Sequence, residues 1–136
     1  MIIESIMSRD VHTVRPDQSL REAADAMRRL NIGSLPVRDN DRLVGMLTDR
    51  DIVVRAVAEG DIDNRRVGDV MSSALKYCYA SDEVEDIARN MASLEVRRLP
   101  VVDAQKRLVG MVSLANMVHA PPAAATVMAQ GVATPH

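Results

Sequence analysis

The chain has 136 residues with 17 basic and 19 acidic side chains, so its formal net charge at pH 7 is only −2. A chain of this length is expected to form one compact domain that buries roughly two-thirds of the surface of the unfolded chain. The balanced charge argues against a nucleic-acid footprint, and the lack of Phe and Trp argues against the aromatic platforms on which single strands stack.

One order of motifs occurs twice along the chain. Met71 repeats Met7 after 64 residues (71 − 7), and Gly110 repeats Gly45 after 65 (110 − 45), so one residue has been inserted near Gln105-Lys106 in the second copy. The segments 42–53 and 107–118, which both begin with RLVGM, are identical at 6 of 12 positions. Such a tandem repeat predicts two half-domains that pack on each other, because one alone cannot bury its apolar face.

The first copy predicts a helix, two strands and a second helix. The segment 16–19 is a turn and helix start, and apolar residues then recur at helical spacing at Leu20, Ala23, Ala24, Met27 and Leu30. Two short apolar runs around a polar turn at 39–41 indicate strand, turn and strand. A helix from 49 to about 59 completes the copy.

The second copy repeats this order. Ser81 is expected to cap a helix with apolar positions at Val84, Ile87, Ala88, Met91 and Leu94. Two strands and a helix at 114–120 follow. We therefore divide the chain into repeat 1 (1–58), a polar linker with two glycines (59–69), repeat 2 (70–120) and a flexible C-terminal tail (121–136).

The sharpest local signal lies where the second strand of repeat 1 ends. The Thr48 hydroxyl, the first free N–H groups of the helix and the Asp51 carboxylate converge there. Hydroxyl and N–H groups hold a phosphate, and a carboxylate accepts from the two hydroxyls of a ribose. The same Thr-x-x-Asp pattern is also close to a capping box, which needs no ligand. The matching positions in repeat 2 are Ser113 and Asn116.

With these phrases the chain resembles a tandem pair of CBS domains, the family named for cystathionine beta-synthase. The resemblance covers residues 1–120 and rests on IGSLPV followed by LVGMLTDRD, and on VRRLPV followed by LVGMVS. It implies an α/β (α+β) fold of two β-α-β-β-α repeats related by a pseudo-twofold axis. It also implies two clefts that bind adenosine nucleotides or related adenosyl compounds.

Carried onto this chain, the first cleft joins the Thr-x-x-Asp phrase of repeat 1 to residues of repeat 2. Asp51 would accept from the ribose, Leu75 and Val96 would sandwich the adenine, and cations would neutralise the phosphate, arginine being the better bidentate partner. The residues implied for this cleft are Thr48, Asp51, Leu75, Lys76, Val96, Arg97 and Arg98.

The second cleft departs from the family pattern. Asn116 stands where the family has the ribose-binding acid, and it lacks the charge that roughly doubles the strength of such a hydrogen bond. No arginine stands at Gly33-Ser34. We expect this site to be weak or empty; its implied residues are Val11, His12, Ile32, Gly33, Ser34, Ser113 and Asn116.

The remaining chemistry-bearing residues receive structural interpretations. Cys78 is expected to be a small core residue in a strand equivalent to Val14, and a single cysteine builds no disulfide framework. The matched methionines Met27, Met46, Met91 and Met111 are predicted to pack in the core. The three histidines lack the spacing of a metal site, and no catalytic constellation is seen. We predict no metal, no required cofactor and no enzymatic activity.

The N-terminal residues resemble no signal sequence, and no window reaches the roughly 18 apolar residues of a membrane span, so we expect a soluble, cytoplasmic protein. The predicted function is a regulatory module that binds an adenosine-containing ligand and passes the change to a partner protein. The alternative is an interaction module whose clefts are vestigial. Apolar faces at 20–30 and 84–94 predict a homodimer.

Overall fold

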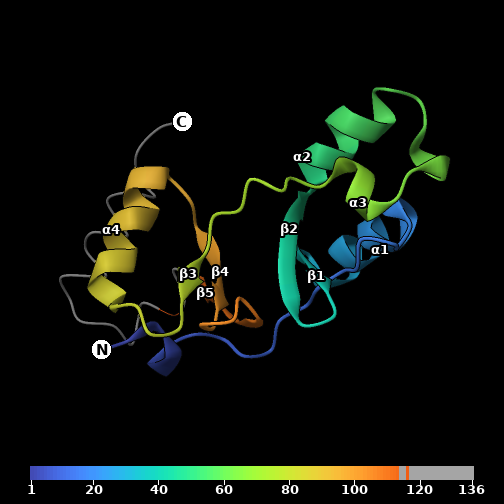
Figure 1. The fold of residues 1–136 in the computed structure, drawn as a ribbon. Coiled ribbons are helices and arrows are strands. Elements are labelled where there is room, and N and C mark those ends of the chain that lie inside the picture. Colours follow the sequence, from blue (N-terminus) through green and yellow to red (C-terminus); the bar gives the residue numbers. More distant parts are fainter. Residues whose placement is uncertain (114–115, 117–136) are drawn as a thin grey trace. The chain divides into compact units, whose positions relative to one another are not determined.

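The computed structural model describes residues 1–113 and residue 116 (Figure 1). The chain length predicts one compact domain. The contacts between residues instead divide the chain into two compact units. Residues 12–75 form the first-repeat unit; residues 1–11 and the described residues from Lys76 onward form the second-repeat unit. Each unit therefore contains a segment that belongs, by sequence, to the start of the other repeat.

The first-repeat unit is built around an antiparallel hairpin. Leu35 pairs with Leu47 in this hairpin, and Val14 adds a parallel bridge to Val37 at its edge. The elements are α1 (Leu20–Leu30), β1 (Ser34–Asp39), β2 (Arg42–Thr48), α2 (Asp49–Ile52), the π-helical turn η2 (Val53–Val57), the 3-10 turn η3 (Ile62–Asn64) and α3 (Val67–Val70). The helix predicted at 49–59 is thus a short α-helix that continues as a π-helical turn.

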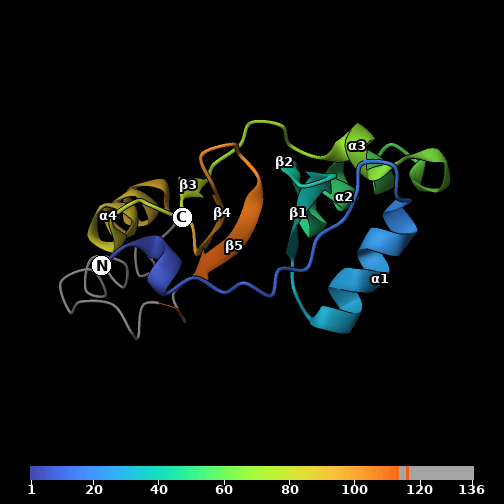
Figure 2. The same cartoon turned by 60° about the horizontal axis from the view of Figure 1, so that its bottom comes forward.

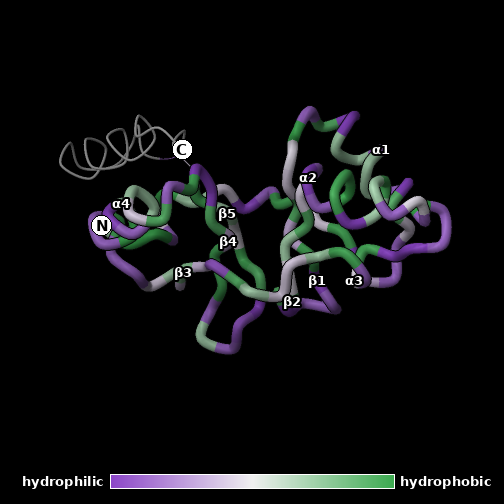
Figure 3. The backbone as a smooth tube through the Cα atoms, turned by 90° about the horizontal axis from the view of Figure 1, so that it is seen from above, coloured by the Kyte–Doolittle hydropathy of each residue, from purple (hydrophilic) through white to green (hydrophobic). Residues whose placement is uncertain are grey.

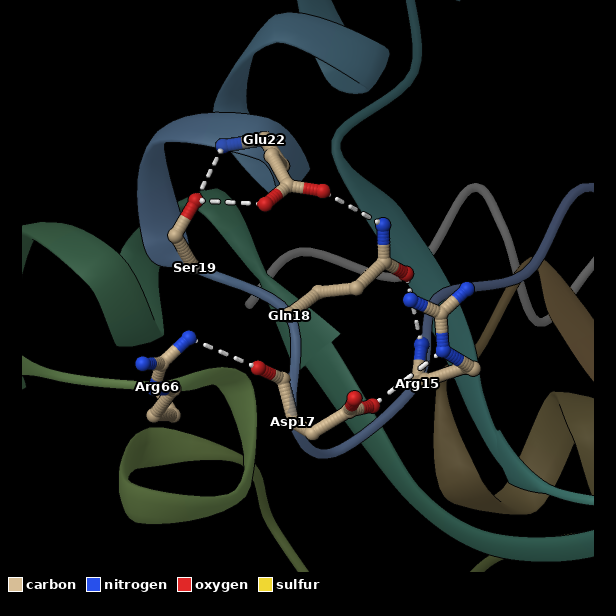
Figure 4. Close-up of polar contacts among 6 residues, drawn as sticks. All are labelled: Arg15, Asp17, Gln18, Ser19, Glu22 and Arg66. Atoms are coloured by element: carbon tan, nitrogen blue, oxygen red, sulfur yellow. Dashed lines mark hydrogen bonds and ion pairs between the residues drawn. The ribbon is translucent and has the colours of Figure 1, made fainter.

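Helix α1 begins where the sequence predicts. The Ser19 hydroxyl accepts from the Glu22 backbone N–H at 3.1 Å and donates to the Glu22 carboxylate at 3.2 Å, while Gln18 donates to the other carboxylate oxygen at 3.1 Å (Figure 4). Such contacts satisfy N–H groups that have no partner inside the helix. Arg66 donates to the Asp17 carbonyl at 3.0 Å, which ties the chain before α3 to the start of α1.

One face of α1 packs on the β1–β2 hairpin to form the core of this unit. Leu20 and Ala23 of α1 are fully buried, as are Leu35, Val37 and Leu47 of the hairpin. The helical spacing of the apolar residues therefore predicts the buried face correctly. Ala24 is exposed and lies outside it.

The second-repeat unit has a three-stranded sheet in the order β3-β4-β5 (Figure 2). Its elements are the 3-10 turn η1 (Ile3–Ser5), β3 (Cys78–Tyr79), α4 (Val84–Leu94), β4 (Arg98–Val102) and β5 (Leu108–Ser113). Cys78 pairs in parallel with Val101, as Val14 does with Val37 in the other unit. The predicted equivalence of Cys78 and Val14 is confirmed.

The core of this unit repeats the arrangement of the first. Four residues of α4 pack with strand residues and with the N-terminal turn: Val84, Ile87, Ala88 and Met91. The tube is mostly hydrophobic along β4 and β5 and mostly hydrophilic in the loop between them (Figure 3). Of the four methionines predicted for the core, Met27 and Met91 are buried, whereas Met46 and Met111 are only half-buried.

The predicted cap of α4 is wrong. The N-cap residue is Glu83, whose side chain makes no capping hydrogen bond, and Ser81 lies in the turn before it. The turn is instead closed by Asp82, which accepts from the Tyr79 backbone N–H at 2.8 Å. Gln18 does the same for Arg15 in the first repeat, also at 2.8 Å, so the turn is shared while the cap is not.

The inserted residue of the second repeat lies in its hairpin loop. Asp39 pairs with Arg42 around a two-residue loop in the first hairpin, whereas Val102 pairs with Leu108 around a longer loop in the second. Lys106 takes a positive φ of 62° in this longer loop. The predicted place of the insertion is confirmed.

The Met-Ser phrase that opens each repeat docks on the hairpin of the other repeat. Met46 and Ser72 exchange two backbone hydrogen bonds of 2.9 and 2.8 Å in the first-repeat unit. Met111 and Ser8 exchange equivalent bonds of 2.9 and 2.8 Å in the second. These long-range pairs explain why each compact unit combines chain from both repeats.

The segment 59–69, predicted to be a linker, is partly packed structure. Helix α3 begins within it, and Val67 and Val70 of that helix are fully buried in the first-repeat unit. The turn η1 at Ile3–Ser5 occupies the equivalent place in the second-repeat unit. The predicted helix at 114–120 and the tail at 121–136 lie outside the described residues, apart from Asn116. No helix among the described residues is long and apolar enough to cross a membrane.

Candidate ligand-binding site

Thr48 and Asp51 form a complete capping box at the end of β2. The Thr48 backbone N–H donates to one Asp51 carboxylate oxygen at 2.9 Å, and the Asp51 N–H donates to the Thr48 hydroxyl oxygen at 3.0 Å. Both side chains are half-buried. The hydroxyl proton of Thr48 and the second Asp51 oxygen, Oδ1, take part in none of the hydrogen bonds found within the described chain, so both groups can still meet a ligand.

Ser113 and Asn116 make a different closed arrangement at the end of β5. Asn116 Oδ1 accepts from the Ser113 backbone N–H at 2.7 Å and from its hydroxyl at 3.0 Å. Asn116 Nδ2 donates to the Ile6 carbonyl at 2.7 Å. The amide thus uses its oxygen and one of its two N–H donors inside the unit.

The residues predicted for the first cleft are divided between the two units. Thr48, Asp51 and the half-buried Leu75 belong to the first-repeat unit. The second-repeat unit holds Val96, which packs against its core, together with the exposed cations Lys76, Arg97 and Arg98. The cleft that would join them remains a prediction from the family resemblance.

The residues predicted for the second cleft are divided in the same way. Val11, Ser113 and Asn116 belong to the second-repeat unit, and His12, Ile32, Gly33 and Ser34 to the first. Ser34 is the strand partner of Thr48, and Asp49 donates its backbone N–H to the Gly33 carbonyl at 2.9 Å. The Gly33-Ser34 turn therefore lies beside the Thr-x-x-Asp phrase of its own repeat.

Strand pairing gives Arg98 a neighbour that its position in the sequence does not reveal. Arg98 is the register partner of Ser113, as Ser34 is of Thr48. Directly opposed residues of an antiparallel pair have Cβ atoms about 5 Å apart on one face. Arg98 and Ser113 therefore project from the same face of the sheet in their own unit.

In the described part of the chain, Cys78 is a buried thiol and no cluster of acidic groups is placed to hold a metal ion. Burial raises the pKa of the Cys78 thiol to about 12, with a smaller contribution from the Asp82 carboxylate, so the thiol stays protonated at neutral pH. Residues 1–113 and 116 contain no group of three or more His, Cys, Asp or Glu residues placed to hold a metal ion. The core role predicted for Cys78 is confirmed.

Sequence reasoning missed Arg55, Ile6 and Val70. Arg55 Nη1 donates to the Val70 carbonyl at 3.2 Å, at the place where Asn116 serves the Ile6 carbonyl in the other repeat. These bonds use backbone oxygens, which carry no signature in the sequence.

A family model matches the chain twice. The model, described as "CBS domain", matches residues 3–57 and 67–123. A relative in Bacillus subtilis, CBS domain-containing protein YhcV, is 41% identical over 115 residues, covering 85% of this chain and 81% of its own. Hypoxic response protein 1 of Mycobacterium tuberculosis is 36% identical over 133 residues, covering 96% of this chain and 92% of its own.

Solved structures of similar fold carry different bound groups. A crystal structure of Hypoxic Response Protein I with two coordinated zinc ions superposes with a TM-score of 0.77 at 37% identity, over 87% of this chain and 97% of that one. CBSX2 of Arabidopsis thaliana in complex with AMP gives 0.75 at 29% identity, over 88% and 94%. The CBS domain pair of MJ0100 with 5'-methylthioadenosine and S-adenosyl-L-methionine gives 0.71 at 27%, over 87% and 93%.

Proposed function

The chain belongs to the CBS domain family as a tandem pair, and from this membership we propose that it is a non-catalytic regulatory module that binds an adenosine-containing ligand. AMP, ADP, ATP and related adenosyl compounds share the adenine and ribose that the proposal requires. Two structures similar to this chain support the class of ligand, one with AMP and one with 5'-methylthioadenosine and S-adenosyl-L-methionine. No cofactor is required, and the ligand acts as a regulator of an unidentified partner protein.

The observation that carries the proposal is the unused oxygen of Asp51. Its capping role occupies Oδ2, and Oδ1 has no hydrogen-bond donor among the described residues. A carboxylate oxygen that accepts from a ribose hydroxyl forms a charge-assisted hydrogen bond, which is shorter and stronger than a neutral one. The capping box holds this side chain in place before the ligand arrives, so little rotamer freedom is lost on binding.

The remaining contacts of the proposed site are apolar and cationic. Leu75 and Val96 are half-buried aliphatic side chains of the kind that cover the faces of a purine. Lys76, Arg97 and Arg98 are exposed and carry the positive charge that a phosphate needs. The proposed first site, as the resemblance to the family implies it, consists of Thr48, Asp51, Leu75, Lys76, Val96, Arg97 and Arg98.

A second candidate function is an interaction module with vestigial clefts. The capping box of Thr48 and Asp51 is complete without a ligand, which favours this alternative. Val53, Val54 and Val57 are also exposed at 57, 49 and 53%, and they offer an apolar surface to another protein. The two functions differ in whether the purified chain binds a purine.

The test is calorimetry with AMP, ADP, ATP, adenosine and S-adenosylmethionine on the wild-type chain and on two Asp51 variants. Asp51→Ala should cost about 1.5 to 3 kcal/mol of binding free energy, the range for a hydrogen bond to a charged group. Asp51→Asn keeps an oxygen for the Thr48 N–H, so its thermal stability should stay near wild type while ligand affinity falls. Asp51→Ala also loses the N3 half of the capping box and a charge near the helix N-terminus, about 0.5 to 1 kcal/mol of stability.

The asparagine variant is the matched control for folding. If Asp51→Asn retains both stability and wild-type affinity, the carboxylate acts only as a cap. If the wild-type chain binds none of the five compounds, the interaction module is the better description.

A further inference from the structure

The two repeats make one equivalent contact with different donors. Ile6 and Val70 lie 64 residues apart (70 − 6), at the ends of the equivalent turns η1 and α3. The last carbonyl groups of a helical turn have no partner within it and need a donor from elsewhere. Arg55 supplies this donor to Val70 at 3.2 Å, and Asn116 supplies it to Ile6 at 2.7 Å.

The difference follows from the chemistry of the residue that ends each phrase. Asp51 is a carboxylate, which only accepts hydrogen bonds, so it cannot serve the Val70 carbonyl. Asn116 is an amide, which accepts from Ser113 through Oδ1 and donates to Ile6 through Nδ2. Asp51 therefore has a free acceptor oxygen, whereas Asn116 has in its place an N–H group that donates to the backbone.

We propose that Asn116 is a latch that holds the first eight residues of the chain on the second repeat, and that it is not a ligand-binding residue. Several backbone bonds attach this segment to the same unit. Ile3 donates to the Asp82 carbonyl at 2.9 Å and Glu4 to the Ala80 carbonyl at 2.9 Å, while Ser8 pairs with Met111. The Asn116 contact lies between these two groups of bonds, at Ile6.

The latch decides which of the two phrases can take a ribose, a consequence that rests on the proposed function. A hydroxyl that approached Asn116 would find Oδ1 accepting two hydrogen bonds and one N–H already donated to Ile6. Asp51 keeps a whole oxygen atom unused among the described residues. The ligand site is therefore the one that contains Thr48 and Asp51, and nucleotide should bind with a stoichiometry of one per chain.

The latch is tested by amide hydrogen exchange on the full chain. Asn116→Asp keeps the acceptor for Ser113 but places a carboxylate oxygen where Nδ2 lies 2.7 Å from the Ile6 carbonyl oxygen. We expect exchange at the amides of Ile3, Glu4 and Ser8 to become about tenfold faster or more, as the loss of one partly buried hydrogen bond implies. Asp51→Asn is the matched control and should leave these three amides at the wild-type rate.

Asn116→Ala removes the donor without adding a charge, so it tests the same contact if the aspartate variant folds poorly. Unchanged exchange at the three amides in both variants would overturn the latch. This readout needs no ligand and remains decisive even if the chain binds no nucleotide.

Calorimetry with AMP on Asp51→Ala tests the second half of the proposal. We expect AMP binding about tenfold to 150-fold weaker than wild type at a single site, and unchanged by the further substitution Asn116→Ala. Residual AMP binding that disappears in the double variant Asp51→Ala with Asn116→Ala would show that Asn116 is a ligand-binding residue, and would overturn the inference independently of the exchange result.

Discussion

At the scale of single residues, the two Thr/Ser-x-x-Asp/Asn phrases differ in what they leave unused. Both close a cap through a backbone N–H, at Thr48 and at Ser113. Only the aspartate retains an oxygen without a hydrogen bond among the described residues, because the single side-chain oxygen of the asparagine accepts from Ser113 and its nitrogen donates to Ile6. The two side chains differ only in that Asn116 has an amide nitrogen where Asp51 has a second oxygen. This difference separates a candidate binding residue, Asp51, from a structural one, Asn116.

The two arginines at the start of β4, Arg97 just before it and Arg98 as its first residue, provide a test of where a phosphate lies. Arg97→Ala and Arg98→Ala should each weaken AMP binding about threefold to tenfold, because exposed charges contribute modestly, and should leave adenosine nearly unchanged. Calorimetry with both ligands at two salt concentrations measures this, and added salt should weaken AMP alone. Equal losses for AMP and adenosine would place the phosphate away from both arginines. Arg98 lies opposite Ser113, which belongs to the second predicted cleft. The effect of Arg97→Ala is therefore the clearer test of a phosphate in the first cleft.

The buried thiol of Cys78 predicts how stability depends on alkaline pH. Its pKa is raised from 9.0 to about 12 in the folded chain. Above pH 9 the unfolded chain releases this proton while the folded chain keeps it, so the free energy of unfolding should fall as pH rises from 9 to 12. The loss due to Cys78 is about 1 kcal/mol by pH 10. Urea denaturation at pH 8 and pH 10 should show a smaller decrease in Cys78→Ala than in the wild type.

At the scale of elements, each Met-Ser phrase and each LVGM phrase form one joint. A Cβ atom added at Gly45 would lie 2.6 Å from the Met71 sulfur and 2.9 Å from the Ser72 carbonyl oxygen. At Gly110 the same atom would lie 2.6 Å from the Met7 sulfur and 2.8 Å from the Ser8 carbonyl oxygen. The repeated glycines are therefore required because a neighbouring backbone passes directly over them.

Gly45→Ala should accordingly destabilise the chain by about 1 to 3 kcal/mol, the usual range for overpacking. The flexible methionine side chain can move aside, but the Ser72 carbonyl belongs to a paired backbone and cannot. Chemical denaturation measures the loss, and adding Met71→Ala should recover only part of it. A Gly45→Ala chain as stable as the wild type would mean that the joint opens at little cost.

At the scale of the whole molecule, the apolar faces expected to form a homodimer are used inside their own units. Most apolar residues of α1 and α4 are buried in the two cores, whereas Ala24 is exposed, Leu30 is half-buried and Leu94 is 44% exposed. The largest concentration of exposed apolar side chains among the described residues lies instead on η2, at Val53, Val54 and Val57. The homodimer stays a prediction, and its most suitable surface is now this turn.

Val54→Asp should therefore shift a wild-type dimer toward monomer in light scattering at micromolar concentration, because a buried unpaired charge is costly at an interface. Leu94→Asp is the matched control on α4 and should leave the assembly unchanged. If Leu94→Asp dissociates the dimer and Val54→Asp does not, the interface lies on the α4 face. A wild-type chain that is monomeric with and without nucleotide would rule out the dimer.

The sequence alone determined the repeat, the types of most elements and the candidate phrases. Helical spacing predicted the buried residues of α1 and α4 because burial of one face imposes a periodicity on the chain. The site of the insertion followed from counting, and Thr48 with Asp51 followed from the chemistry of a strand-to-helix turn. These features depend on residues close together in sequence.

The tertiary structure alone decided which distant backbone groups meet. Ser8 pairs with Met111 and Ser72 with Met46, and the compact units consequently exchange the opening segments of the two repeats. Backbone N–H and C=O groups are the same in every residue except proline, so their long-range partners leave no pattern to read. For the same reason the commitment of Asn116 to the Ile6 carbonyl became visible only in the folded chain.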